Sequence, residues 1–169
     1  MRRLALLLAL ATPVLLNAQS QTTTPCPTTA TLDQLISALD DAVSGPPDKD
    51  RTCFRQIMLP DVRLIPVSTP PGSTTPAPHI LTTDDWIAAV RKRGTTPFYE
   101  VQVKYSSETF GHIAHLWSTY ETRPTPDGKP IARGINSIQA VFDGQQWKIL
   151  EILWQTENAT DQIPAQYLP

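Results

Sequence analysis

A run of apolar residues at helical spacing opens the first regular segment of the chain. Its members recur at three- and four-residue intervals, the period of one buried helix face: Leu32, Leu35, Ile36, Leu39 and Val43. Thr29 or Thr31 can cap the start of this helix, and Gly45 before a proline pair ends it. Asp40 and Asp41 lie off the apolar stripe, so we expect both carboxylates to be solvated.

A short second helix and one strand are predicted next. Asp50 can cap the helix, and Pro60 ends it. Val62–Val67 then has the composition of a strand, in which Pro66 indicates a sheet edge or a bulge. The proline-rich stretch 66–78 predicts a stiff, exposed loop that lies as a lid over a pocket.

The third predicted helix has the clearest boundaries. Thr82 and Asp85 stand at the spacing of a capping box, although Asp replaces the preferred Glu. Leu81 and Trp86 flank them as a hydrophobic staple, and Gly94 is a suitable residue to follow the last turn.

Strand patterns dominate the second half of the chain. Four segments carry them, and an Asp-Gly hairpin signal joins the last two: Phe98–Ser107, His112–Arg123, Ile135–Phe142 and Trp147–Gln155. In the first segment, the alternation predicts Val101, Val103 and Tyr105 on one face of a strand. Helices followed by a run of antiparallel strands predict an α+β fold.

The strand predicted for His112–Arg123 mixes apolar and polar residues on both of its faces. A sheet that faces water on one side usually separates them more cleanly. We therefore expect both faces to be covered, one by the helices and a pocket and the other by a second subunit. The sequence thus predicts a homodimer that forms through the sheet.

The N-terminus has the features of a secretory signal peptide. A basic start, an apolar run from Leu4 to Leu16 and the small residue Ala18 predict cleavage after residue 18. We expect no membrane span after cleavage and a secreted or periplasmic protein. The predicted parts are a signal peptide at 1–18, a flexible spacer at 19–30, one domain at 31–157 and a C-terminal tail at 158–169.

Composition narrows the classes of partner and site. A net charge of −2 and a pI near 5.9 argue against a nucleic-acid-binding surface. Cys26 and Cys53 are the only two cysteines, and in an exported chain they predict one disulfide.

Three segments together resemble the nuclear transport factor 2-like superfamily, in particular its SnoaL-like branch. They are 111–121 (GHIAHLWSTYE), 133–139 (RGINSIQ) and 143–149 (DGQQWKI). The resemblance implies a cone-shaped barrel, in which a curved antiparallel sheet wraps around three N-terminal helices and leaves an apolar pocket open at one end. Many relatives are homodimers, and the fold hosts both enzymes and binding proteins, so it does not define an activity.

One branch of that superfamily, similar to ketosteroid isomerases, can be tested residue by residue. Its base is a carboxylate five residues beyond a helix-ending Asp; counted from Asp61, that position is Pro66. Its oxyanion-hole Tyr falls on Leu35. Neither side chain can take the required role, so we do not expect that chemistry.

The histidines of the predicted sheet are the candidate catalytic groups. His112 and His115 are three residues apart, so in one strand they point to opposite faces and cannot hold one metal ion. We predict no metal site and no cofactor. One of the two, His115 or His112, faces the pocket and can act as a general base, with Tyr120 beside it; a buried histidine without a catalytic task is the alternative.

Aromatic and polar residues of the same region form the predicted pocket wall: Trp86, Tyr105, Trp117, Tyr120, Arg133, Asn136 and Trp154. The tryptophans can equally be ordinary core residues, and Glu121 can pair with Arg133 across a hairpin. The sequence favours an exported domain that binds a small hydrophobic molecule. The alternative is an isomerase, cyclase or hydrolase with a histidine base, in which Tyr120, Asn136 or Arg133 polarises a carbonyl group.

Overall fold

The computed structural model describes residues 25–169, so the predicted signal peptide and the first part of the spacer lie outside the described residues. The described elements are α1 (Leu32–Val43), α2 (Thr52–Ile57), β1 (Met58–Ser68), β2 (Ala77–Pro78), α3 (Thr83–Arg91), β3 (Tyr99–Phe110), β4 (Ile113–Arg123), β5 (Ala132–Phe142), β6 (Trp147–Thr156) and a 3-10 turn at Ala165–Tyr167. None of the helices described is long and apolar enough to cross a membrane.

The strands form one curved six-stranded sheet in the order β2-β1-β6-β5-β4-β3. Strands β3 to β6 pair antiparallel with their chain neighbours, as the hairpin pattern predicts. The prediction of a purely antiparallel sheet is wrong, because β1 pairs parallel with β6. Strand β2 has only two residues, which lie in the proline-rich loop and pair with the outer edge of β1.

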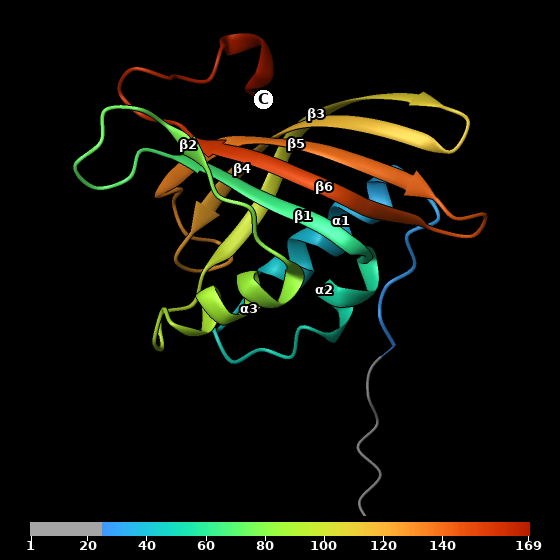
Figure 1. The fold of residues 1–169 in the computed structure, drawn as a ribbon. Helices are drawn as coiled ribbons and strands as arrows, with labels where there is room; N and C mark the ends of the chain where they lie inside the picture. The colour runs from blue at the N-terminus through green and yellow to red at the C-terminus, as the bar shows by residue number, and fades with distance from the viewer. Residues whose placement is uncertain (1–24) are drawn as a thin grey trace, which may run out of the picture.

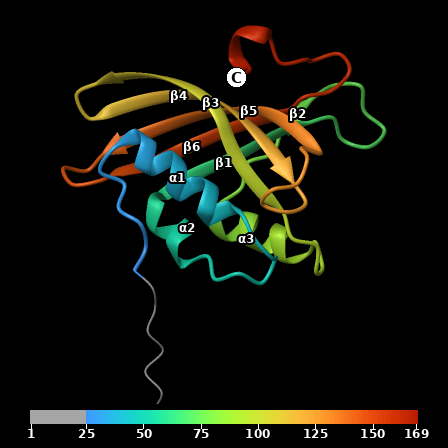
Figure 2. The same ribbon diagram turned by 180° about the vertical axis from the view of Figure 1, so that it is seen from behind.

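The three helices described lie on the concave side of the sheet (Figures 1 and 2). α3 follows β1 and β2 in the chain rather than preceding the sheet. The C-terminal segment after β6 crosses the opposite, convex side (Figure 1). The concave side is therefore enclosed by helices, and the convex side is partly covered by the end of the chain.

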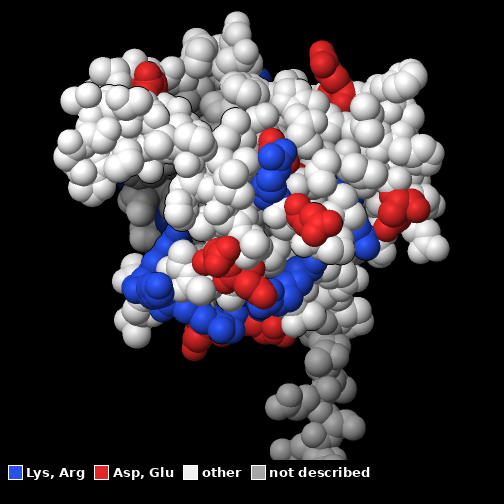
Figure 3. All heavy atoms as spheres, viewed as in Figure 1, with Lys and Arg blue, Asp and Glu red and all other residues white. Residues whose placement is uncertain are grey.

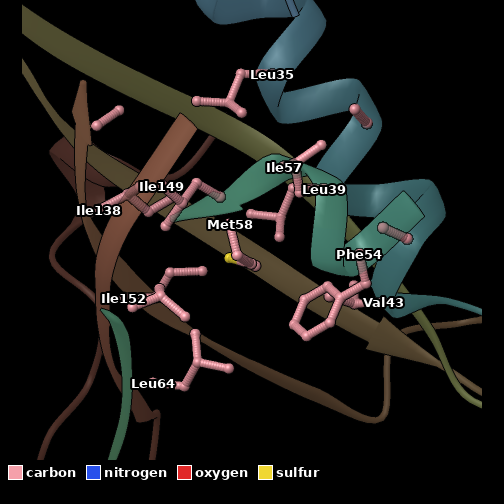
Figure 4. Close-up of a cluster of buried hydrophobic side chains, with 14 of the residues drawn as sticks. Leu35, Leu39, Val43, Phe54, Ile57, Met58, Leu64, Ile138, Ile149 and Ile152 are labelled. Carbon is pink, nitrogen blue, oxygen red and sulfur yellow. The ribbon is translucent and has the colours of Figure 1, made fainter. Parts of the chain in front are cut away.

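The apolar stripe of α1 forms the centre of the core. Leu35 and Leu39 are fully buried and pack with Phe54 and Ile138, among other side chains (Figure 4). Thr31 caps the helix in a reciprocal capping box with Gln34. Fully burying a Leu side chain contributes roughly 2 kcal/mol, so this stripe holds the helix against the sheet.

The C-terminal end of α1 covers the free edge of β3. The Asp40 carboxylate accepts a hydrogen bond from the Gln102 amide at 3.1 Å, and Ser44 Oγ accepts one from the Glu100 amide at 2.9 Å. Gly45 pairs with Phe98 through two backbone hydrogen bonds. These contacts satisfy edge amides that would otherwise be open to another strand. The expectation that Asp40 is solvated is therefore wrong.

The predicted disulfide joins Cys26 to Cys53, with 5.3 Å between the Cα atoms. It attaches the segment before α1 to α2. The expected end of α2 is wrong, because Ile57 is its last residue and Pro60 lies inside β1. A proline fits there, since it needs no amide partner where the parallel ladder with β6 is irregular.

Candidate functional site

A cavity of about 230 Å³ opens on the concave side of the sheet, between it and the helices. Eight of its fourteen lining residues are apolar, and they come from helices and strands alike: Leu39, Val43, Phe54, Leu64, Trp86, Phe98, Ile152 and Trp154. Polar residues complete the lining: Arg93, Glu100, Tyr120, Thr122, Asn136 and Thr156. An apolar wall with a few convergent polar groups is the usual form of a small-molecule site.

The polar part of the lining is a hydrogen-bonded cluster centred on Glu100. Glu100 Oε1 accepts hydrogen bonds from Gln102 Nε2 at 2.9 Å and from Asn136 Nδ2 at 3.3 Å. Gln102 Oε1 accepts in turn from Ser118 Oγ at 2.6 Å and from Asn136 Nδ2 at 3.2 Å. The strand pairing explains this convergence, because Gln102 is opposite Tyr120 and Ser118 is opposite Asn136. The cluster thus spans three adjacent strands on one face.

The surroundings of Glu100 favour its protonated form. The pKa of Glu100 is raised to about 7, chiefly by loss of contact with water and to a smaller extent by the negative charge of Asp40. Hydrogen bonds from Asn136 and Gln102 and the charge of Arg93 act in the opposite direction. Burial also raises the pKa of Asp40 to about 6, against the hydrogen bonds from Gln102. The cavity therefore holds a carboxyl group that titrates near neutral pH.

Tyr120 places its hydroxyl in the same cavity, 3.0 Å from Thr156 Oγ1. Burial raises the pKa of Tyr120 to about 12, so the phenol stays protonated. Gly134 leaves the room for this ring, because a Cβ atom there would lie 2.4 Å from the Tyr120 hydroxyl oxygen. The glycine of β5 and the tyrosine of β4 are thus matched across the ladder.

Two arginines lie near the cavity and differ in their partners. Arg51 is buried, donates to the carbonyl oxygens of Ala42, Ser44 and Pro46 and packs over the Trp86 ring. Arg93, in the turn after α3, is exposed and lines the cavity, with its guanidinium 4.7 Å from the centre of the Phe98 ring. Arg51 closes the end of α1, whereas Arg93 lies at the rim.

Solved structures show which fold this is. A nuclear transport factor 2-like protein of unknown function from Pseudomonas putida aligns with a TM-score of 0.57 at 15% identity, over 82% of this chain and 94% of that one. A protein of unknown function with a cystatin-like fold from Nostoc punctiforme gives 0.57 at 8% identity, over 76% and 90%. A proposed ketosteroid isomerase from Parabacteroides distasonis gives 0.50 at 16% identity, over 80% and 98%.

The chain has the nuclear transport factor 2-like fold. No protein-family model and no curated protein matches the sequence. At these identities the solved structures establish the fold, and the site must be interpreted from its own residues.

The nuclear transport factor 2-like fold brings four of the predicted pocket residues together. Trp86, Tyr120, Asn136 and Trp154 line the concave cavity. Trp117 lies on the convex face, where its ring is 5.9 Å from that of Tyr167. Two further predicted pocket residues, Tyr105 and Arg133, are also outside the cavity lining.

Tyr105 and Arg133 have structural partners. The Tyr105 hydroxyl donates to Asp33 of α1. Arg133 pairs with Glu157 at 2.9 Å, whereas Glu121 pairs with Arg123 at 2.7 Å. The expected pair between Glu121 and Arg133 is therefore replaced by two separate pairs.

Neither candidate histidine lies in the concave cavity. His112 is in the turn before β4, exposed, with Nδ1 3.2 Å from the carbonyl oxygen of Phe142. His115 is on the convex face, with Nε2 3.2 Å from Ser137 Oγ. The titratable groups of the cavity are Glu100, Tyr120 and Arg93 instead.

The sequence contains one indication that Glu100 belongs to the site, although the strand prediction did not use it. Phe98, Glu100 and Gln102 alternate in the segment predicted to be a strand, so they share one face. The alternation predicted Val101, Val103 and Tyr105 together on one face of the strand, opposite Gln102. A bulge between Gln102 and Lys104 shifts the phase of β3, so that Glu100 and Gln102 face the cavity and Tyr105 joins their side.

A second groove, of about 420 Å³, lies on the convex side between the sheet and the C-terminal segment. Trp117, Leu153 and Ile163 are among its walls. Its two acidic groups are already engaged: Glu157 by Arg133 and the Ile163 amide, and Asp161 by the side chains of Gln155 and Asn158. The smaller concave cavity is the better candidate site, because it brings the hydrogen-bonded Glu100 cluster, the Tyr120 hydroxyl and Arg93 together in one lining.

Proposed function

We propose that this protein is a small-molecule-binding domain of the SnoaL-like type and that its ligand occupies the concave cavity. The observation that carries the proposal is a cavity in which aromatic and aliphatic side chains lie beside the hydrogen-bonded Glu100 cluster. An apolar body would pack against Trp86 and Phe54, and a polar group of the ligand would reach Glu100 and Tyr120.

The volume of the cavity limits the size of the ligand. An apolar cavity of roughly 150 Å³ in another protein binds benzene. The 230 Å³ here therefore suits a molecule with one or two rings. The neutral two-ring compound 2-naphthamide is a suitable probe, since it combines an apolar body with a hydrogen-bonding group.

Isothermal titration calorimetry of 2-naphthamide tests the site. Thr122 lines the cavity, and Thr122→Trp would fill it, so binding should weaken at least tenfold. Thr109→Trp makes the same change at an exposed position of β3 and should leave affinity unchanged. Equal affinity in both variants would contradict the proposal, and so would no binding to the unaltered protein.

A second candidate function is proton transfer, favoured by the position of Glu100. Its carboxylate would accept a proton from a carbon acid, while Asn136 Nδ2 or the Tyr120 hydroxyl stabilises the negative charge that develops. A pKa of about 7 for Glu100 suits this task, because the group can both take and return a proton near neutral pH. This assigns the base to a carboxylate of β3 in place of a histidine.

The ring opening of 5-nitrobenzisoxazole tests the proton-transfer function. In this reaction a base removes the ring C–H proton while the N–O bond breaks, giving a cyanophenolate whose absorbance is measured. We expect a rate above that of free carboxylate, rising with pH around 7, and lost in Glu100→Gln. The same rate in wild type and variant would rule out Glu100 as the base.

We also propose that the protein is exported and forms a homodimer. The disulfide between Cys26 and Cys53 is compatible with an extracytoplasmic location, where such bonds persist. The predicted leader at 1–18 supports export. We also propose a homodimer through the sheet, because apolar side chains such as Ile113 and Leu153 are exposed on it.

A further inference from the structure

Arg93 is a cation at the rim of the concave cavity without an acidic partner within ion-pair distance among the described residues. Its guanidinium lies over the Phe98 ring, which places the charge beside the cavity. Contact with protein lowers the pKa of Arg93, and the carboxylate of Glu100 partly offsets this. A cation that has lost part of its water gains more from a counterion than one in open solvent.

Neighbouring arginines, unlike Arg93, have acidic or carbonyl partners among the described residues. Arg55 pairs with Asp84 and Arg63 with Glu151, while Arg51 is satisfied by three carbonyl oxygens. Lys and Arg side chains gather around the end of α3 (Figure 3), where Arg91 and Lys92 precede Arg93. Among these basic side chains, Arg93 is the one that lines the cavity.

We propose that the ligand of the concave cavity is an anionic amphiphile, a small aromatic acid whose negative group pairs with Arg93 while its rings lie against Trp86 and Phe54. The proposal rests on the proposed binding function and adds the charge of the ligand. Guanidinium groups bind carboxylates through two parallel hydrogen bonds, which gives both affinity and orientation.

The protonation state of Glu100 should affect the binding of an anionic ligand. A ligand anion near the rim would repel an ionised Glu100, whereas the protonated carboxyl can donate a hydrogen bond to it. Asp40, Tyr120 and Arg93 are the other titratable groups that act on Glu100. Binding of an acid should therefore be accompanied by proton uptake and should strengthen as the pH falls from 8 to 6.

The test compares 2-naphthoate with 2-naphthamide, which have similar shape and differ in charge. Calorimetry should show at least tenfold tighter binding of the acid to the unaltered protein. Arg93→Gln should abolish this preference, because it should weaken binding of the acid far more than binding of the amide. Arg91→Gln removes a nearby charge from the last turn of α3 and should keep the preference. Arg93→Lys retains the charge and should keep part of it.

The outcomes separate this inference from the function on which it rests. If both probes bind equally, or if Arg93→Gln keeps the preference for the acid, the inference is wrong and the binding function stands. If neither probe binds, both fail. Glu100→Gln should remove the pH dependence of acid binding, and an unchanged dependence would show that Glu100 does not take up the proton.

Discussion

At the scale of single residues, the site depends on how one carboxyl group is held in partly apolar surroundings. Glu100 has hydrogen-bond donors on two neighbouring side chains but no cation within ion-pair distance among the described residues. Burial therefore outweighs its favourable contacts, and the pKa of Glu100 rises to about 7, so that the protonated and ionised forms are both populated near neutral pH. A carboxylate held for structure alone would be expected to have a paired charge.

The pH dependence of stability should report this group. Because the pKa of Glu100 is raised from 4.5 to about 7 on folding, the folded state holds the proton more tightly than the unfolded state. The resulting stabilisation is complete below pH 4.5 and is lost as the pH rises to about 7. Glu100→Gln should flatten the melting temperature across this range and raise stability at pH 8 by on the order of 2 kcal/mol.

Asp40, with its pKa raised to about 6, should leave a smaller slope of the same sign in the Glu100→Gln variant. Thermal unfolding followed by circular dichroism from pH 4 to pH 8 measures both proteins. Parallel curves for the wild type and Glu100→Gln would contradict the account of Glu100.

At the scale of elements, short-range sequence patterns predicted the helix starts and the strands that depend on contacts between residues close in the chain. Thr31, one of the two predicted caps, starts α1, and the predicted capping box at Thr82 starts α3, since both caps involve residues only three apart. The four strands of the second half also follow from alternation and turns. The parallel pairing of β1 with β6 could not be predicted, because its partners are about 90 residues apart in the chain and no turn signal connects them.

The β3 bulge and the α1 edge contact explain why the candidate site was largely missed. Alternation predicts two faces, but a bulge exchanges them part-way along a strand and has no marker such as glycine in this segment. Asp40 lies off the apolar stripe of α1, yet the open edge of β3 gives it an amide partner. Both features arise from tertiary pairing, so Trp86 and Tyr120 were easier to find than Glu100.

At the scale of the whole molecule, the convex face is only partly covered. The C-terminal segment packs Tyr167 against Trp117, and Thr119 Oγ1 donates to the Tyr167 carbonyl oxygen at 2.6 Å. Other apolar side chains of the sheet remain open, including Ile113, which is 59% exposed, and Leu153, which is 38% exposed. Exposed apolar surface on a sheet face favours contact with a partner.

Native mass spectrometry should detect a dimer of the mature chain, and its mass should also report cleavage after Ala18. Ile113→Lys should shift the population toward the monomer, because it places a charge within the proposed contact. Ile80→Lys is the matched control, since Ile80 is 63% exposed and lies outside the named strands. A monomer at all concentrations, or equal loss of dimer in both variants, would show that the sheet face is not the interface.

The central claim is that the concave cavity is the ligand site. The most direct measurement is a crystal structure with 6-bromo-2-naphthamide, in which anomalous scattering locates the bromine. The account predicts a bromine peak in the cavity among Phe54, Trp86 and Trp154. A peak in the groove beside Trp117 on the convex face, or no ordered bromine at saturating concentration, would contradict it.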